Sequence, residues 1–134
     1  MIVVDSCAWI DYFTGVKTPA SEWLAAHFEP SQTLLGDLIA LEVLRGFRSD
    51  KEYWTAREIF DVLPVALILD ISRAIRAAER YHQLRKVGVT IRKSGDVAIA
   101  SYCIDENVPL LTSDRDFAPF AAHMGLALVV PIDT

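Results

Sequence analysis

The chain has 134 residues, of which 52% are hydrophobic and 23% charged, and its net charge is −5. This length fits one domain that buries roughly two thirds of its unfolded surface, so we predict a single domain over residues 1–134. The composition excludes a disordered chain. No apolar stretch approaches the ~20 residues of a membrane span, and no basic signal-peptide region precedes the first strand pattern. We therefore expect a cytoplasmic protein that does not enter a membrane.

Short apolar runs typical of buried strands alternate with amphipathic segments typical of helices. In chain order we predict a strand at 2–4, helices at 6–13 and 19–28, a strand at 33–35 and helices at 37–46 and 51–63. A strand at 65–69, a helix at 72–87, a helix from 95 or 96 to 106, a strand at 109–112, a helix at 116–123 and a strand at 128–130 follow. Ser6, Asp37 and Ser72 are the predicted helix caps. Trp54 is predicted to face inward, and Ile75 to lie on the apolar side of its helix, opposite the arginines. This alternation predicts an α/β fold with a parallel sheet covered on both faces.

The two cysteines, Cys7 and Cys103, both fall in helical patterns. Two cysteines alone provide neither a disulfide framework nor the ligand spacing of a zinc site. We interpret both as small buried hydrophobic residues in a reducing compartment.

One segment is strongly basic within an acidic protein. Residues 71–95 hold seven basic residues and one acid, a net charge of +6, whereas the remainder has six basic and seventeen acidic residues, a net charge of −11. Basic surface drives phosphate binding, so this segment is a candidate for holding a nucleic acid. On the charge pattern alone, a solvated helix face is an equally good interpretation.

Four acidic residues lie beside apolar runs, where an uncompensated carboxylate is costly. Asp5 and Asp114 come at or just past the carboxyl ends of the first and fourth predicted strands. Ligands of parallel sheets gather outside these ends, so both carboxylates face one crevice if the two strands are neighbours. Glu42 and Asp96 lie in helical segments among apolar neighbours. Four acids so placed predict a shared cation.

The ligand types indicate a hard cation. Carboxylates without histidine or cysteine suit Mg²⁺, for which Mn²⁺ can substitute, rather than zinc. One or two such ions activate a water molecule and neutralise the charge that develops on a phosphodiester. For each acid alone, a helix cap or a surface position is the better interpretation. Only the joint pattern favours metal ligation.

Four segments resemble the motifs of a nuclease family. The first is Ile2-Val-Val-Asp-Ser-Cys-Ala-Trp-Ile-Asp-Tyr-Phe and the second is Leu41-Glu-Val-Leu-Arg-Gly. The third is Arg92-Lys-Ser-Gly-Asp-Val-Ala-Ile-Ala and the fourth is Leu110-Leu-Thr-Ser-Asp-Arg-Asp-Phe. In this order, and across nearly the whole chain, they resemble PIN-domain nucleases, in particular the VapC toxins of bacterial VapBC toxin–antitoxin pairs.

The resemblance implies a three-layer α/β/α sandwich with a mostly parallel five-stranded sheet. It also implies a site. The positions that match the family's catalytic acids and Mg²⁺/Mn²⁺ ligands are Asp5, Glu42, Asp96 and Asp114. Asp116 is a second acid in the last motif, and it could orient a metal-bound water or simply cap the helix that begins at Phe117. We rank it below Asp114 as a ligand. Ser6 and Thr112 match small hydroxylic positions that support the site.

The resemblance further implies an activity and partners. We expect a metal-dependent endoribonuclease toxin in which a metal-activated water hydrolyses RNA, whether tRNA, rRNA or mRNA, and translation is inhibited. It implies that the protein forms a homodimer. It also implies that a small VapB-like antitoxin binds and inhibits this dimer in a larger complex. The basic run could track the RNA backbone or accept an acidic partner. The candidate RNA contacts are Arg45, Arg76, Arg80, Arg85, Arg92 and Lys93.

Two other interpretations are weighed against this one. A catalytically inactive PIN-like module would bind RNA or protein without cutting it, but such a domain usually loses one or more of the acids, and this chain retains all four. A phosphatase or phosphotransferase would use Asp5 as nucleophile, and it needs a lysine near the site and a second aspartate close behind the first. Ser6 and Cys7 follow instead, so this pattern is poor.

Overall fold

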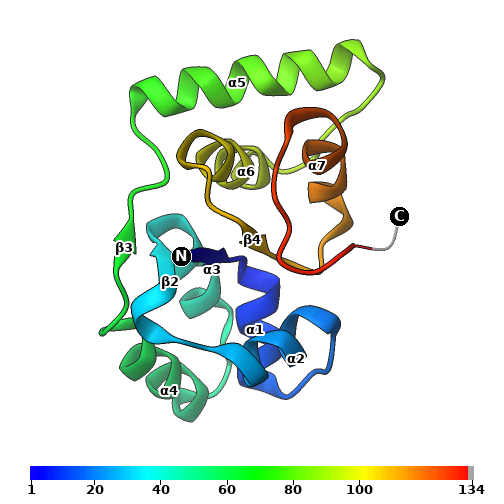
Figure 1. Ribbon diagram of the computed structural model, residues 1–134. Helices are drawn as coiled ribbons and strands as arrows, with labels where there is room; N and C mark the ends of the chain where they lie inside the picture. Colours follow the sequence, from blue (N-terminus) through cyan, green and yellow to red (C-terminus); the bar gives the residue numbers. More distant parts are fainter. Residues whose placement is uncertain (133–134) are drawn as a thin grey trace.

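The computed structural model describes residues 1–132 and places a parallel sheet between layers of helices (Figure 1). The predicted domain runs to residue 134, and its last two residues lie outside this described part. Four strands form the sheet in the order β3-β2-β1-β4. Their bounds are β1 (Ile2–Val4), β2 (Thr33–Gly36), β3 (Val65–Ala66) and β4 (Leu110–Leu111).

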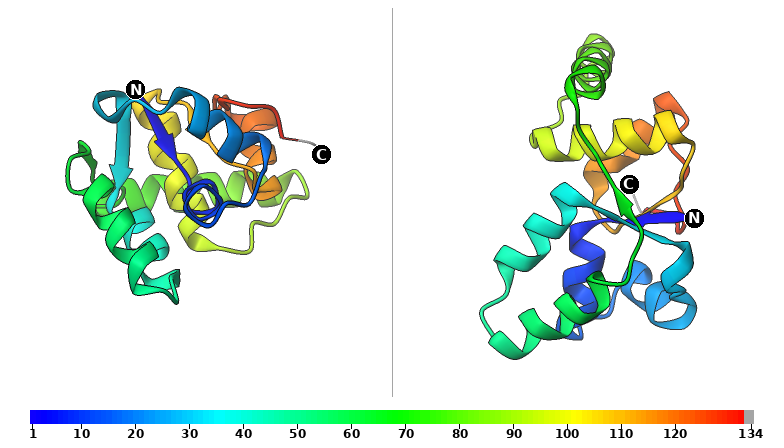
Figure 2. Two further views of the ribbon diagram at one scale, coloured as in Figure 1. Left: turned by 90° about the horizontal axis from the view of Figure 1, so that it is seen from below. Right: turned by 90° about the vertical axis from the view of Figure 1, so that its left-hand side faces the viewer.

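Seven helices and two short 3-10 turns connect the strands within residues 1–132. The helices are α1 (Ser6–Thr14), α2 (Pro19–His27), α3 (Asp37–Gly46), α4 (Asp50–Phe60), α5 (Ile71–Lys86), α6 (Ser94–Glu106) and α7 (Ala118–Met124). The 3-10 turns are η1 (Pro30–Gln32) and η2 (Arg115–Phe117). Helices α1 to α4 cover one side of the sheet, α6 and α7 cover the other, and α5 lies on the outer side of α6 (Figures 1 and 2). The predicted three-layer α/β/α architecture is confirmed.

The prediction of a fifth strand at 128–130 is wrong, because this segment forms only an isolated bridge. Leu128 makes a single parallel bridge with Leu110. The backbone there forms two hydrogen bonds, from the Leu110 N–H to the Ala127 carbonyl (2.9 Å) and from the Val129 N–H to the Leu110 carbonyl (3.0 Å). Pro131 follows at once and has no N–H to continue the ladder. The sheet therefore has four strands, with one bridge at the β4 edge.

Several predicted caps and faces differ in the structure. Asp70, and not Ser72, caps α5 by accepting a hydrogen bond from the Arg73 N–H at 2.8 Å. Trp54, predicted to face inward, is 58% exposed, and Ile75, predicted to lie opposite the arginines of its helix, is 54% exposed. Helices α4 and α5, which carry these residues, both lie at the outside of the molecule (Figure 2). The rest of the protein therefore covers only part of the apolar side of each helix.

The predicted caps before α1 and α3 are also each displaced by one residue. Asp5 occupies the N-cap position of α1 instead of Ser6, and Gly36 occupies that of α3 instead of Asp37. The Asp37 carboxylate still bonds locally, to the Leu38 N–H at 2.8 Å, and it also accepts the Ile68 N–H at 3.0 Å. Asp37 therefore ties the start of α3 to the chain that follows β3.

The core brings the two acid-bearing strands together. Val3 and Val4 of β1 are fully buried, and they pair in register with Leu110 and Leu111 of β4. The Asp5 N–H extends this pairing with a 2.9 Å hydrogen bond to the Leu111 carbonyl. The chain winds from β1 to β2 and β3 on one side and places β4 on the other, so the strand order reverses between β1 and β4. Ligands bind at such a switch point in parallel sheets.

Candidate metal centre

Three acidic side chains come together beyond the carboxyl end of β4. Asp96, Asp114 and Asp116 each offer a carboxylate oxygen, and these oxygens all lie within 4.8 Å of one another. Asp96 is in the first turn of α6 and is only 5% exposed. Asp114 precedes η2, and its Oδ1 accepts the Asp116 N–H at 2.9 Å. Asp116, which sequence reasoning ranked below Asp114 as a ligand, thus belongs to the tightest group of acids in the described chain.

Asp5 lies outside this group but is held beside it. Its Oδ2 accepts hydrogen bonds from the Thr112 hydroxyl at 3.0 Å and from the Cys7 thiol at 3.2 Å. The same Thr112 oxygen accepts the Asp114 N–H at 3.0 Å. Burial raises the pKa of Asp5, and the charge of Asp114 adds to this, while the hydrogen bonds from Cys7 and Thr112 and the nearby Ser6 backbone N–H dipole oppose it. Asp5 and Asp114 are therefore coupled through Thr112 and through their charges.

Glu42 joins from α3. Its side chain is half-buried, and burial together with the charge of Asp5 raises its pKa, against the lowering effect of Arg45 and Lys93. Glu42 also lies outside the three-acid group. Since its pKa responds to the charge of Asp5, it faces the same region of negative charge from the other side.

Asp96 is also strongly perturbed. Burial, and then the charges of Asp5, Asp114 and Asp116, raise its pKa to about 7, while Lys93 acts against them. Like charges this close disfavour ionisation of one another. A cation bound among them would remove that repulsion.

The orphaned oxygens test whether these acids fit a cation. Asp5 Oδ1, Glu42 Oε1 and Asp96 Oδ2 are buried and have no hydrogen-bond partner among the described residues. Buried polar atoms in proteins are nearly always bonded, so three orphans on three converging carboxylates call for a positive partner. All the donors are oxygens, the ligands that Mg²⁺ and Mn²⁺ prefer. The residues fit such an ion.

The basic residues predicted to hold RNA divide into two sets. Arg76 Nε lies 2.9 Å from Asp105 Oδ2, and Arg80 Nη2 lies 2.8 Å from Asp105 Oδ1. These ion pairs join α5 to α6, and we call them the α5–α6 clasp. An RNA contact by either arginine stays a prediction. The other candidates are exposed and form no ion pair within residues 1–132; they are Arg45, Arg85, Arg92 and Lys93. Of these, Arg45 and Lys93 influence the pKa of Glu42.

Sequence reasoning missed Cys7. It was interpreted as a small buried hydrophobic residue, whereas its sulfur bonds to Asp5 and lies 3.4 Å from the Thr112 hydroxyl oxygen. Its position two residues after a strand-end acid was the available signal. The backbone of Ser6 lowers the pKa of Asp5, and support of the site by the Ser6 hydroxyl stays a prediction.

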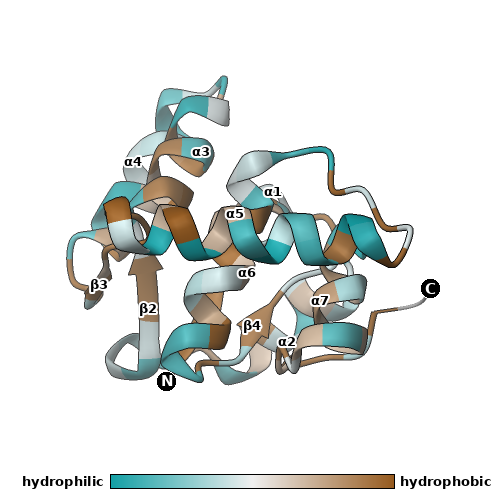
Figure 3. Cartoon of the chain, turned by 90° about the horizontal axis from the view of Figure 1, so that it is seen from above, coloured by the Kyte–Doolittle hydropathy of each residue, from teal (hydrophilic) through white to brown (hydrophobic). Residues whose placement is uncertain are grey.

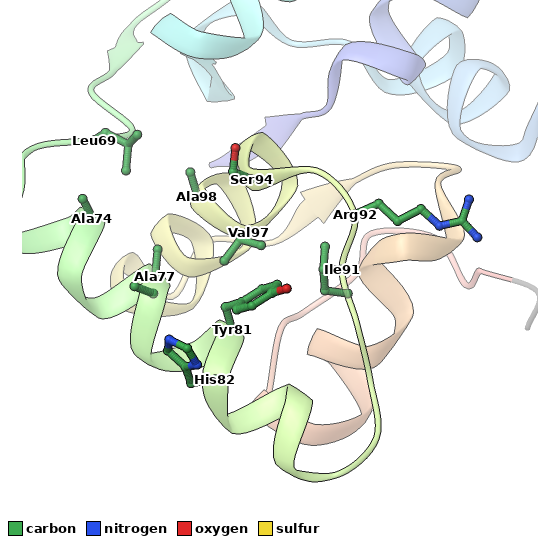
Figure 4. A pocket seen from close by; sticks show the side chains of 11 residues that line it. Leu69, Ala74, Ala77, Tyr81, His82, Ile91, Arg92, Ser94, Val97 and Ala98 are labelled. Carbon is green, nitrogen blue, oxygen red and sulfur yellow. The ribbon is translucent and has the colours of Figure 1, made fainter.

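A hollow between two helices lies apart from these acids. It has a volume of about 460 Å³ and lies between α5 and α6, where Ala77 and Tyr81 face Val97 and Ala98 (Figure 4). None of the five acids lines it. This hollow is apolar, so it does not provide the chemistry of the acidic site.

Comparison with known families decides the classification. The family model described as the PIN domain matches residues 2–122. The chain belongs to the PIN-domain family. Within this PIN-domain chain, the matched segment contains all five acids of the candidate metal centre and all four motifs noted in the sequence.

Relatives of the chain confirm the resemblance to the VapC group. It is 29% identical over 119 residues to the VapC ribonuclease Mb1587 of Mycobacterium bovis, covering 87% of this chain and 89% of that protein. The same values hold for the ribonuclease VapC11 of Mycobacterium tuberculosis.

Solved structures of low sequence identity share the fold. One is VapBC2 of Rickettsia felis bound to a promoter DNA fragment (TM-score 0.72, 18% identity, covering 96% of this chain and 97% of that chain). Another is a toxin–antitoxin complex of Klebsiella pneumoniae (TM-score 0.70, 18% identity, covering 98% and 100%). Both matches extend over nearly the whole PIN domain.

Proposed function

We propose that this PIN-domain chain is a metal-dependent endoribonuclease that acts as the toxin of a VapBC-type pair. The observation that carries the proposal is the set of buried, unpartnered oxygens on Asp5, Glu42 and Asp96 at the switch point of the sheet. The relatives named as VapC ribonucleases support the substrate class. The solved toxin–antitoxin complexes support a small VapB-like antitoxin as partner.

The proposed roles follow from these positions. Asp5, Glu42, Asp96 and Asp114 would hold one or two Mg²⁺ or Mn²⁺ ions, with Asp116 beside them. When bound, the ion supplies an activated water and stabilises charge on the scissile phosphate. Thr112 holds the Asp5 carboxylate in place. The exposed residues Lys93 and Arg45 would contact RNA phosphates next to the acids.

The remaining elements of the proposal concern the cell. RNA cleavage would inhibit translation, and the protein would act in the cytoplasm, where RNA is available. No helix within residues 1–132 is both long and apolar enough to cross a membrane. Binding of the antitoxin would cover the acidic site or the basic residues around it.

We also propose a homodimer that forms through an apolar face on α3, α5 and the chain between β3 and α5. Leu41, Leu67, Leu69, Ile71 and Ile75 are 47–79% exposed. Leu69 lines both the hollow between α5 and α6 and a second hollow beside Leu41. Figure 3 shows apolar segments along the start of α5 and on nearby β3. Exposed apolar surface of this kind favours association, and a second copy would cover the same face in an isologous dimer.

The test of the proposed activity uses purified protein and total RNA. We expect cleavage with Mg²⁺ or Mn²⁺, no cleavage in excess EDTA, and recovery on adding Mn²⁺. Sequencing the new 5′ ends would identify the RNA, and Asp96→Asn protein is the control for contaminating nucleases. RNA binding without cleavage in every metal would support the inactive binding module instead, and full cleavage in excess chelator would exclude the metal mechanism.

The dimer is tested separately by sedimentation or light scattering. Ile71→Glu with Leu69→Glu should give monomers, whereas Val87→Glu, an exposed apolar residue at the far end of α5, should not. If the double variant keeps the wild-type mass, another surface forms the dimer, and a monomeric wild-type protein would overturn the dimer itself.

A further inference from the structure

The Asp5 carboxylate does not form the hydrogen bond that its position at the start of α1 predicts. Asp5 is the N-cap residue of α1, and an aspartate there normally accepts a backbone N–H from the first turn of its helix. Its side chain makes no such cap bond. Its two oxygens are instead treated differently: Oδ2 has two side-chain donors, and Oδ1 is buried with none among the described residues.

Each donor to Oδ2 has a single hydrogen to give. The Thr112 hydroxyl donates at 3.0 Å and the Cys7 thiol at 3.2 Å. A carboxylate oxygen has two lone pairs in the carboxylate plane, so these two donors occupy both of them. Rotating the carboxylate would break both bonds at once. The pair therefore fixes which oxygen of Asp5 is turned away from the protein donors.

Cys7 lies between the two strand ends that carry the acids. Its sulfur contacts the Thr112 oxygen at 3.4 Å, and the Ser113 hydroxyl oxygen lies 3.5 Å from it as a donor. A donor to the sulfur polarises the S–H bond and strengthens the bond that the thiol donates in turn. Cys7 is thus a link between the segment before Asp114 and the carboxylate of Asp5.

We propose that Cys7 is a positioning residue of the metal centre, whose thiol hydrogen bond to Asp5 Oδ2 directs Oδ1 towards the cation. This inference rests on the proposed function in so far as Asp5 is taken as a metal ligand. A residue that hydrogen-bonds to a metal ligand affects metal binding although it does not contact the ion. Removing such a residue lowers metal affinity or activity by about 10–100-fold.

The experiment measures Mn²⁺ binding without RNA, by electron paramagnetic resonance of the free ion. Cys7→Ala removes the donor, Cys7→Val removes it while filling most of the space, and Cys7→Ser keeps a donor. Cys103→Ala is the matched control, because Cys103 is buried in α6 and its thiol makes no hydrogen bond to a carboxylate within residues 1–132. The Mn²⁺-induced rise in the melting temperature is a second readout on the same proteins.

We expect Mn²⁺ affinity to fall about tenfold or more in Cys7→Ala and Cys7→Val, to return close to wild type in Cys7→Ser, and to stay unchanged in Cys103→Ala. Wild-type affinity in the first two variants, or equal losses in the serine variant and the alanine variant, would overturn the positioning role. These outcomes differ from failure of the proposed function, in which wild-type protein itself binds no Mn²⁺ or binds it without cleaving RNA.

Discussion

The Thr112 hydroxyl donates a 3.0 Å hydrogen bond to Oδ2 of Asp5 and thereby joins two residues that are 107 positions apart in the sequence. Thr112 follows β4 and Asp5 follows β1, so the bond lies at the carboxyl edge of two neighbouring parallel strands. Since Thr112 also accepts the Asp114 N–H, the orientation of one acid depends on the position of another. The candidate site is a connected unit.

Neutralising single acids tests this connection. Asp5→Asn, Glu42→Gln, Asp96→Asn and Asp114→Asn should each reduce RNA cleavage by about a hundredfold or more, because each removes a ligand from a shared ion. Asp116→Asn should be milder. Cleavage rates at saturating Mn²⁺ measure the effect. Pairs of substitutions should cost far less than the product of the single losses, and wild-type rates in two of the four single variants would contradict a shared site.

Protein without metal should lose stability as the pH rises. The pKa of Asp96 is raised from 3.8 to about 7 in the folded protein, so the folded state holds its proton more tightly than the unfolded state between these values. Unfolding free energy therefore falls as the pH increases through this window and levels off above it. The raised pKa values of Asp5 and Glu42 act in the same direction.

Thermal unfolding in EDTA near pH 5 and near pH 8 measures this change. Asp96→Asn should flatten the dependence and be more stable than wild type at the higher pH, because it removes one of the repelling charges. Mn²⁺ should restore the wild-type melting temperature there. A chelated wild-type protein whose stability increases over this range would show that the acids are not mutually repelling.

Asp105 should anchor α5 to the body of the protein. Burial alone would raise the pKa of Asp105, but hydrogen bonds from Arg80 and Arg76 outweigh it and lower that pKa. Asp105→Asn should reduce the unfolding free energy by about 1–3 kcal/mol, since Arg76 and Arg80 lose the charged partner of their hydrogen bonds. Urea unfolding measures the loss, and hydrogen exchange should increase in α5.

The matched control is Asp61→Asn. Asp61 also pairs with an arginine, Arg57 at 3.5 Å, but its side chain is 61% exposed. An exposed pair contributes at most about 1 kcal/mol, so this substitution should change stability little. Equal effects of the two substitutions would mean that the α5–α6 clasp is no stronger than a surface ion pair.

RNA affinity should depend more on Lys93 and Arg45, the exposed basic residues beside the acids, than on the two arginines that pair with Asp105. Affinity for single-stranded nucleic acid falls with salt at a slope of about −0.7 per contacted phosphate. Lys93→Gln and Arg45→Gln should weaken RNA binding and make that slope shallower, because both residues are exposed and lie near Glu42. Binding is measured at several salt concentrations in an Asp96→Asn background, where RNA stays intact.

Arg76→Gln is the comparison for these variants. If Arg76 serves only the clasp, the substitution lowers stability and leaves the salt slope unchanged. A shallower slope would show that the Arg76–Asp105 pair opens when RNA binds, as the sequence prediction of an RNA contact at Arg76 requires. Identical slopes in all three variants would remove Lys93 and Arg45 from the RNA site.

The sequence alone was enough for the architecture and for the position of Asp5 and Asp114 relative to the strands. Apolar runs such as the one in β1 are buried on both faces, and this local pattern, repeated with helices between, specifies a covered parallel sheet. Asp5 comes at the end of such a run and Asp114 shortly after another, and these positions placed both at the carboxyl edge. These inferences hold because the spacing of apolar residues along a segment indicates which faces of that segment are buried.

Only the tertiary structure decided which side chains meet. Periodicity does not report the angle at which helices pack, so the pairing of Arg80 with Asp105 across 25 positions was hidden, as was the grouping of Asp116 with Asp96. The fifth strand failed because one bridge at Leu110 is followed by Pro131. Cys7 looked like a buried hydrophobic residue until the strand order β1-β4 brought Thr112 and Ser113 beside it. Contacts between distant segments depend on strand order and packing, which no single segment encodes.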